Sequence, residues 1–264
     1  MNEVINKTEL FLFDMDGTLY LGNKLFDFTK ELLKTIKSKG KKYLFMTNNS
    51  SKSVDDYINK LKYMGILATY DDFITSSQAT AYYILKNYPK TKFYVCGTNS
   101  LKKELNEKGI ILTENTLDAE GVIIGFDTEL TFKKLEDVCK ILTNKNVIYI
   151  ATNPDYVCPT EYGSVPDCGS FCDMIFNATK KRPFVIGKPS PLMIDLAIDK
   201  KGTSKSKTLV IGDRIYTDIK CGLNAGVTTL LVMSGETDCE TLNNSDIKPH
   251  YVLESGQGIL DILK

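Results

Sequence analysis

The chain has 264 residues, of which 42% are hydrophobic and 25% are charged, a composition typical of a globular protein with a sizeable core. Its 33 basic and 33 acidic residues cancel, which argues against binding to nucleic acid or to an anionic membrane surface. No window approaches the roughly 18 apolar residues of a membrane span. The segment from Met1 to Glu9 also lacks the pattern of a signal peptide, so we expect a cytoplasmic protein.

The seven cysteines and the single histidine argue against several kinds of site. Odd and scattered cysteines in a chain of this length indicate reduced thiols rather than disulfides. Cys168 and Cys172 are four residues apart, but no second pair accompanies them and His250 lies far along the chain, so we expect no zinc site. Because no nucleophile motif lies near His250, we expect neither Ser-His-Asp nor Cys-His catalysis.

The first predicted strand is the apolar run Leu10 to Phe13, which leads directly into Asp14, Asp16 and Gly17. A short apolar run that ends in a turn signal is typical of a central strand in a parallel sheet. Side chains two residues apart leave a strand on the same face, so we expect both carboxylates to point to one place. Gly17 permits the chain to turn sharply behind them.

A helix, a second strand and a second helix follow. Apolar residues from Leu25 to Ile36 recur at helical spacing, and Gly40 is placed to end that helix. The second strand runs from Tyr43 to Thr47, and Ser53 is a suitable N-cap for a helix that ends at Gly65. This alternation predicts a parallel sheet with right-handed crossovers, whose site lies at the carboxyl ends of its strands.

Between about residues 78 and 180 the alternation continues in a self-contained run that is typical of a smaller α/β unit. Its predicted helices cover 78–88, 100–108 and 131–142, and its predicted strands cover 92–96, 121–125 and 147–151. We expect the proline-containing stretch from 153 to 170 to be irregular and to lead into a short helix.

The final third returns to the first pattern. Strands are predicted at 184–186, 208–211 and 229–232, and helices from Pro191 and around 217–225, before a terminal strand and helix. We therefore predict an α/β fold in which one sheet is interrupted by an insertion. Residues 1–78 and 181–264 would form the core domain, and residues 79–180 would form a cap domain over the site.

Polar clusters follow three more predicted strands: Thr47-Asn48-Asn49, Lys188, and the segment from Asp213 to Asp218. In a parallel sheet these strand ends share one edge, so we expect the clusters to converge with the two acids of the first strand. Carboxylates held within a few ångströms of one another take up protons unless a cation lies among them. Ligands that are all oxygen favour Mg²⁺ over zinc.

In this order, Asp14-Met15-Asp16-Gly17-Thr18, Thr47-Asn48-Asn49, Lys188 and Gly212-Asp213 through Asp218 resemble the four motifs of haloacid dehalogenase (HAD) superfamily phosphatases. The long insertion, with Ala151-Thr152-Asn153-Pro154-Asp155 and Ile186-Gly187-Lys188-Pro189, is similar to the NagD-like, p-nitrophenyl phosphatase subfamily. The resemblance implies a Rossmann-like core with an inserted α/β cap. It also implies a Mg²⁺-dependent phosphatase whose partner is a small phosphorylated metabolite.

The resemblance further implies roles for individual residues. Asp14 would be the nucleophile that accepts the phosphoryl group, and Asp16 the acid that protonates the leaving group and then activates water. Thr47 and the amide of Asn48 would bind the phosphoryl oxygens. Lys188 would neutralise charge on the nucleophile and the phosphate.

The metal ligands and one cap residue follow from the same resemblance. Asp14, the backbone carbonyl of Asp16, and Asp213 would hold Mg²⁺, with Asp218 either a direct ligand or hydrogen-bonded to one. In the cap, Asp155 is expected to face the substrate. Asp167 stands in a Pro166-Asp167 pair where the family usually has Pro-Gly, which leaves the choice of substrate open.

Each motif has a simpler interpretation when it is taken alone. Asp213 and Asp218 could be an N-cap and a first-turn acid of the following helix. Lys188 could be a solvated lysine, and Thr47 and Asn48 could be turn residues. The four motifs gain weight because they occur together and in order.

The sequence thus predicts a Mg²⁺-dependent hydrolase of small phosphomonoesters, such as a sugar phosphate, a nucleotide or a phosphoglycolate-like compound. p-Nitrophenyl phosphate would be an artificial substrate. One alternative is a non-catalytic protein that binds or senses a phosphate ligand, and another is a phosphomutase or dehalogenase of the same superfamily. The physiological substrate and assembly into a homo-oligomer are left open.

Overall fold

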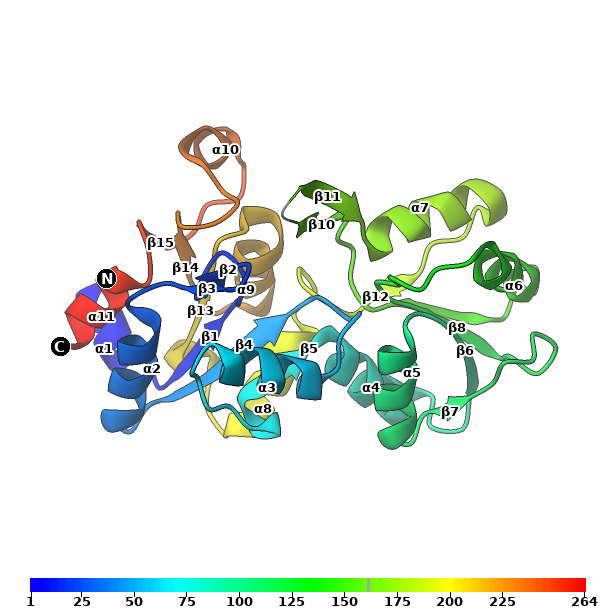
Figure 1. The fold of residues 1–264 in the computed structure, drawn as a ribbon, viewed down its shortest axis with the longest axis horizontal. Helices are drawn as coiled ribbons and strands as arrows, with labels where there is room; N and C mark the ends of the chain where they lie inside the picture. The colour runs from blue at the N-terminus through cyan, green and yellow to red at the C-terminus, as the bar shows by residue number, and fades with distance from the viewer. Residues whose placement is uncertain (161) are drawn as a thin grey trace. The chain divides into compact units, whose positions relative to one another are not determined.

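The computed structural model describes residues 1–160 and 162–264 and divides into two compact units (Figure 1). Unit 1 comprises Met1–Thr47, Ile58–Ile74 and Lys188–Lys264, and unit 2 comprises Asn48–Tyr57 and Thr75–Gly187. Each unit contains a parallel sheet flanked by helices, which confirms the predicted α/β class. The division into a core of 1–78 with 181–264 and a cap of 79–180 stays a prediction.

The main sheet of unit 1 places a fully buried strand near its centre. The strand order is β15-β14-β13-β1-β4-β5, and β1 pairs in parallel with β13 on one side and β4 on the other. Phe13 at the end of β1 lies opposite Ile211 and Phe45, so residues just beyond these positions lie at one edge of the sheet. The strands are β1 (Leu10–Phe13), β4 (Lys42–Thr47), β5 (Phe73–Thr75), β13 (Thr208–Gly212), β14 (Thr228–Val232) and β15 (Tyr251–Leu253).

The helices of unit 1 agree with the apolar spacing of the sequence. On α2 (Thr29–Ser38), Leu32, Leu33 and Ile36 are buried, and the chain leaves the helix through Gly40 at a φ of +71°. The other helices are α1 (Asn2–Lys7), α8 (Leu192–Lys201), α9 (Lys220–Ala225), α10 (Cys239–Asn244) and α11 (Gln257–Leu263), and α3 (Val54–Tyr63) has residues in both units. Among the described residues, no helix is long and apolar enough to cross a membrane.

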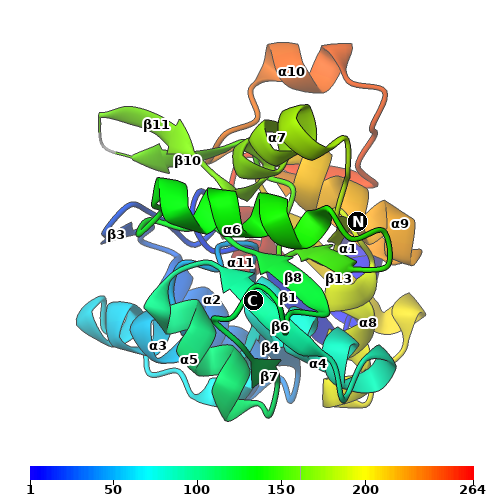
Figure 2. The same ribbon diagram turned by 90° about the vertical axis from the view of Figure 1, so that its right-hand side faces the viewer.

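The main sheet of unit 2 has the strand order β12-β9-β8-β6-β7, with α6 and α7 on one face and α4 and α5 on the other (Figure 2). Side chains such as Ile124, Val138 and Phe171 form the core between this sheet and α6 and α7. The strands are β6 (Lys92–Cys96), β7 (Ile111–Leu112), β8 (Gly121–Ile124), β9 (Ile148–Ala151) and β12 (Phe184–Val185). The helices are α4 (Ser76–Asn87), α5 (Asn99–Glu107), α6 (Phe132–Leu142) and α7 (Cys168–Thr179).

One loop prediction and one strand prediction in unit 2 are wrong. The stretch 153–170, expected to be irregular, contains an antiparallel hairpin of β10 (Val157–Thr160) and β11 (Gly163–Pro166). Its prolines suggested a loop, but a two-stranded ribbon has free edges on which a proline is tolerated. The strand predicted at 184–186 was assigned to the first sheet, whereas β12 pairs with β9 of unit 2. A strand this short carries no signal that identifies its neighbour.

Unit 1 also contains elements that the sequence did not predict. The hairpin of β2 (Tyr20–Leu21) and β3 (Lys24–Leu25) follows β1, and the predicted helix at 217–225 begins as the π-helical turn η3 (Ile215–Ile219) before α9. Such turns are rare and frequently lie at functional sites. Here the turn contains Asp218, one of the predicted site residues.

Candidate active site

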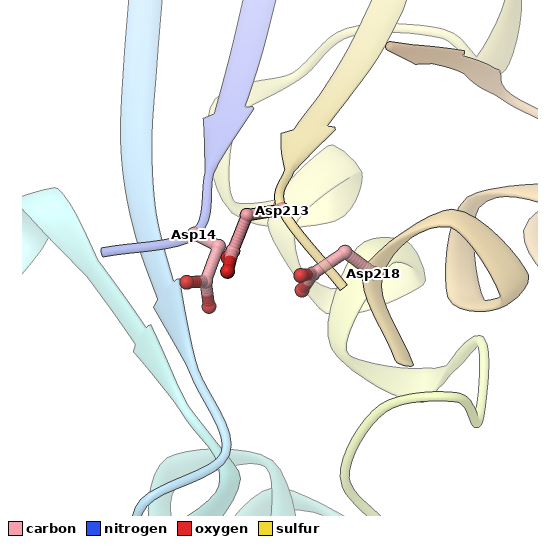
Figure 3. Close-up of side chains that lie close together, drawn as sticks. All are labelled: Asp14, Asp213 and Asp218. Carbon is pink, nitrogen blue, oxygen red and sulfur yellow. The ribbon is translucent and has the colours of Figure 1, made fainter. Parts of the chain in front are cut away.

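Three carboxylates meet at the carboxyl edge of the unit 1 sheet. Asp14 directly follows β1, Asp213 directly follows β13, and Asp218 lies in η3. Each of them offers an oxygen atom within 4.8 Å of oxygens of the other two. Figure 3 shows the three side chains pointing toward one another beyond the strand ends. Parallel pairing of β1 with β13 brings these residues together although about 200 positions separate them in the chain.

Lys188 is the cation of this cluster. Its Nζ lies 2.6 Å from Oδ1 of Asp14 and 2.5 Å from Oδ1 of Asp218, and it donates to the carbonyl of Met46 at 3.4 Å. The residue is only 2% exposed. Burial acts to lower the pKa of Lys188, but the two carboxylates outweigh burial and raise that pKa above its ordinary value. The side chain is therefore a fixed positive charge.

The carboxylate of Asp213 is held between backbone segments. A Cβ atom at Gly17 would lie 2.3 Å from Oδ2 of Asp213, and one at Gly235 would lie 2.0 Å from it, so neither position has room for a side chain. The N–H of Glu236 donates to Oδ2 at 2.8 Å, and the hydroxyl of Thr18 lies 3.4 Å from Oδ1. These contacts fix the orientation of the carboxylate.

The electrostatics of the cluster favour a bound cation. Burial raises the pKa of Asp14 well above its ordinary value, where Lys188 opposes the shift and Asp218 adds to it. Burial and repulsion from Asp218 likewise raise the pKa of Asp213 to about 6. One ammonium cannot balance three carboxylates, so a divalent cation would offset the excess negative charge. The donors are all carboxylate oxygens, which fits a hard ion such as Mg²⁺.

The remaining predicted residues of unit 1 are Asp16 and Thr47. Asp16 is exposed, and its Oδ1 accepts a hydrogen bond of 3.2 Å from the N–H of Gly22 at the turn of the β2–β3 hairpin. Its carboxylate is not one of the three that gather. Thr47 is buried and is the last residue of β4. The roles assigned to both residues stay predictions.

Comparison with known proteins assigns the chain to a family. A haloacid dehalogenase-like hydrolase model matches residues 11–111, and a HAD-hydrolase-like model matches residues 185–257. The 5'-nucleotidase YutF of Bacillus subtilis is 36% identical over 245 residues, which cover 93% of this chain and 94% of that protein. The chain belongs to the haloacid dehalogenase-like hydrolases.

Further relatives of this HAD hydrolase are also phosphatases. The acid sugar phosphatase of Staphylococcus aureus is 33% identical over 241 residues, covering 91% of this chain and 92% of that protein. The crystal structure of 4-nitrophenylphosphatase from Thermotoga maritima is 38% identical, with a TM-score of 0.94 and coverage of 99% of both chains. NagD from Escherichia coli is 29% identical, with a TM-score of 0.85 and coverage of 94% and 96%. These relatives confirm that the chain is a NagD-like HAD phosphatase.

Two predicted site residues of this phosphatase, Asn48 and Asp155, lie in unit 2. The side-chain nitrogen Nδ2 of Asn48 donates to both carboxylate oxygens of Asp155, at 3.1 and 3.3 Å. Asp167 is the N-cap of α7, where its Oδ1 accepts from the N–H of Cys168 and from the amide of Asn153 at 3.4 Å. The charge of Asp167 therefore faces a helix N-terminus, which stabilises it.

The sequence analysis missed a loop of the HAD phosphatase at residues 234–237. The hydroxyl of Ser234 donates to the carbonyl of Gly17 at 2.7 Å, and the N–H of Thr237 donates to the carbonyl of Asp213 at 3.2 Å. The loop closes over Asp213 and ties it to the turn after β1. The Ser234-Gly235 pair lies two residues beyond the apolar strand β14, and such a pair is a loop signal that points to the same sheet edge and could have identified the loop.

Proposed function

We propose that this HAD phosphatase hydrolyses small phosphomonoesters in a Mg²⁺-dependent reaction that begins with attack by Asp14. The observation that supports this most directly is the 2.6 Å contact between Nζ of Lys188 and Oδ1 of Asp14. A carboxylate repels a phosphate dianion, so a carboxylate nucleophile requires fixed positive charge beside it. Lys188 supplies that charge from a buried position.

The proposed reaction has two steps. Asp14 attacks phosphorus, the bond to the leaving oxygen breaks, and the carboxylic acid of Asp16 gives its proton to the departing alkoxide. In the second step Asp16 takes a proton from water, which attacks the aspartyl phosphate and releases inorganic phosphate and the Asp14 carboxylate. The exposure of Asp16 supports this role, because the residue must exchange protons with the leaving group and then with water.

The rate acceleration that the reaction requires is larger than a general acid alone can supply. Hydrolysis of a phosphate monoester can require an acceleration of up to ~10²¹-fold, or ~28 kcal/mol at ~1.36 kcal/mol per decade. One positioned acid contributes only about 10²- to 10⁴-fold. Asp16 therefore cannot carry the reaction, and charge neutralisation together with positioning for in-line attack must supply most of it.

Mg²⁺ would be held by Asp14, the backbone carbonyl of Asp16, and Asp213, and when bound it would neutralise charge on the phosphoryl group and keep Asp14 ionised. Both oxygens of Asp218 already have partners, since Oδ1 contacts Lys188 and Oδ2 accepts from the N–H of Arg214 at 3.1 Å. The contact with Lys188 supports a role for Asp218 in orienting that side chain, and because one of its oxygens lies within 4.8 Å of oxygens of Asp14 and Asp213, it would hold the metal either directly or through a hydrogen bond to a ligand.

Thr47 and Asn48 would bind the phosphoryl oxygens. The proposed substrate classes follow the relatives, whose names specify a 5'-nucleotidase, an acid sugar phosphatase and a 4-nitrophenylphosphatase. A panel of sugar phosphates, nucleotides, phosphoglycolate and p-nitrophenyl phosphate, scored by Mg²⁺-dependent release of inorganic phosphate, tests the proposal. Absence of release from every compound would favour a phosphate-binding protein instead. Light scattering would test assembly into a homo-oligomer.

The nucleophile is tested by Asp14→Asn. The variant should retain the wild-type circular dichroism spectrum and lose turnover of every substrate, whereas Asp27→Asn, which changes an exposed acid of the same unit, should keep normal turnover. Near-normal turnover by folded Asp14→Asn would show that another group attacks.

The acid is tested by Asp16→Asn with two kinds of leaving group. The kcat should fall about 10²- to 10⁴-fold for an alkyl phosphate, because the alkoxide then leaves without a proton. The rate of the first step should fall much less for p-nitrophenyl phosphate, because its phenolate leaves readily without a proton. Equal losses in single-turnover cleavage of both substrates would remove the role of Asp16 as acid.

A further inference from the structure

The sheet of unit 2 has a topological switch point at its carboxyl edge, between β6 and β8. The strand order is β12-β9-β8-β6-β7, so the chain leads from β6 outward to β7 and from β8 outward to β9 on the opposite side. The helix after β6, α5, lies on one face of the sheet, and the helix after β8, α6, lies on the other (Figure 2). In open α/β sheets, ligands bind outside the strand ends at such a switch point. Glycines stand just beyond both strands, at Gly97 and Gly125. In this protein the position is filled by its own chain, the segment that begins at Asn48.

Ser50 is the residue of that segment that reaches the strand ends. Its hydroxyl accepts the N–H of Phe126 at 2.9 Å and is hydrogen-bonded to the hydroxyl of Thr152 at 2.8 Å. Ser50 is 0% exposed, and a Cβ atom at Gly125 would lie 2.9 Å from its Oγ. The next residue, Ser51, accepts the hydroxyl of Thr98 through its carbonyl at 3.1 Å. The segment is therefore bonded to residues that follow β6, β8 and β9.

Asn48 is held through both its backbone and its side chain. Its carbonyl accepts from the hydroxyl of Ser76 at 2.7 Å and from the amide of Asn153 at 2.9 Å. Its amide nitrogen donates to both oxygens of Asp155, and a Cβ atom at Gly187 would lie 2.7 Å from its Oδ1. These contacts fix the orientation of the side-chain amide of Asn48, because the Asp155 carboxylate can accept a hydrogen bond from its Nδ2 but not from its Oδ1.

Asp155 is placed to hold the Asn48 side chain in this orientation. It is 8% exposed, and it accepts from Asn48 and, at 3.5 Å, from the amide of Asn153. The carbonyl of Asp155 also accepts the N–H of Gly169 at 2.8 Å, which ties its backbone to the first turn of α7. Its carboxylate is thus directed at the two asparagine amides.

We infer that Asp155 and Ser50 are positioning residues that orient Asn48 for binding of the substrate's phosphoryl group. This inference rests on the proposed function of Asn48. It gives Asp155 a role different from the substrate contact predicted from the sequence, and it gives Ser50 a role that the sequence did not suggest. A positioning role has a kinetic signature, because the phosphoryl group is common to all substrates and to the product.

The test measures KM for several substrates and the inhibition constant of inorganic phosphate in the Mg²⁺-loaded enzyme. Asp155→Ala should raise KM about 10-fold or more for every substrate, and should raise the phosphate inhibition constant by the same factor. Asp155→Asn keeps an oxygen that accepts from the Asn48 amide and should recover most of the loss. Asp118→Ala, which removes an exposed acid of unit 2, should change neither constant.

A direct substrate contact by Asp155 would give a different pattern. The change in KM would then depend on the alcohol of the substrate, and the phosphate inhibition constant would stay at its wild-type value, which would overturn the inference. In an Asn48→Ala background, Asp155→Ala should have no further effect on either constant, since its target is gone. Additive effects in this cycle would also overturn the inference.

Ser50→Ala provides a separate test of the inference, and this test does not depend on the folding of the Asp155 variants. It leaves the N–H of Phe126 without its hydroxyl acceptor and should raise KM and the phosphate inhibition constant in parallel, again for all substrates. Unchanged constants in a folded Ser50→Ala variant would contradict its positioning role. If wild-type enzyme releases no phosphate from any compound, the proposed function fails. Calorimetric binding of inorganic phosphate to the same variants would then decide the inference separately.

Discussion

Glu104 on α5 is a buried acid, and its replacement by glutamine gives a sharp test of the electrostatics of unit 2. The residue is 5% exposed, and neither carboxylate oxygen has a hydrogen-bond partner among the described residues. Burial raises its pKa from an ordinary 4.5 to about 7, with Asp55, Glu107 and Asp56 adding to the effect and Lys108 opposing it. The carboxyl is therefore neutral in the folded protein at pH values where it would ionise in the unfolded chain.

The size and sign of the effect follow from this difference in pKa. A rise from 4.5 to about 7, at about 1.4 kcal/mol per pH unit, corresponds to about 3–4 kcal/mol. Because the folded pKa is the higher one, this stability is fully present below pH 4.5 and is lost as the pH rises through 7. Glu104→Gln removes the charge and keeps the shape, so its free energy of unfolding should not show this loss.

Urea unfolding at pH 5 and at pH 8.5 measures the effect. The free energy of unfolding of the variant should exceed that of the wild type by about 3–4 kcal/mol at pH 8.5 and by about 1 kcal/mol or less at pH 5. Glu107→Gln changes an exposed acid on the same helix and should show no comparable dependence on pH. A Glu104→Gln advantage that is the same at both pH values, or absent at pH 8.5, would refute the argument from burial.

Three further predictions concern the cluster in unit 1. Lys188→Met leaves the half-buried Asp14 and the buried Asp218 without their ammonium, and should lower the free energy of unfolding of the metal-free protein by about 3–5 kcal/mol in urea titrations. An unchanged midpoint would contradict the buried ion pair of Lys188 and Asp218. Gly235→Ala places a methyl group 2.0 Å from Oδ2 of Asp213, so Mg²⁺ binding measured by calorimetry should weaken at least about 10-fold while the variant remains folded. A chelator should abolish phosphate release and added Mg²⁺ should restore it, and turnover that survives complete chelation would exclude a required metal.

Much of the α/β framework could be predicted because local sequence carries it. The run Leu10 to Phe13 is apolar at every position, and the structure buries every one of its side chains in β1. Polar residues placed directly beyond β1 and β13 predicted that Asp14 and Asp213 would approach, since parallel strands end at one edge. The helix spacing before Gly40 was equally informative, because one face of α2 is buried.

What could not be predicted depends on partners that are distant in the chain. The hydroxyl of Ser50 accepts a hydrogen bond from the N–H of Phe126, which lies 76 positions further along the chain. No periodicity in either segment specifies that pairing. The two residues of β12 can extend either sheet as far as local pattern is concerned. Asp155 was found as a polar residue of the insertion, but its contact with Asn48, 107 positions away, and the bond from its carbonyl to the N–H of Gly169 in α7 are not specified by local sequence.

The backbone slot around Asp213 has a consequence for the choice of ion. Ca²⁺ takes about 6–8 oxygen ligands at about 2.3–2.6 Å and relies on carboxylates that swing to widen its shell, whereas Mg²⁺ requires near-octahedral geometry at about 2.0–2.1 Å. The orientation of Asp213 is restricted, because its Oδ2 occupies the space that a side chain would need at Gly17 and at Gly235, and the same oxygen accepts the N–H of Glu236. Gly17 and Gly235 thus favour Mg²⁺ over Ca²⁺ indirectly, because they restrict the movement of the Asp213 carboxylate that a larger coordination shell would need.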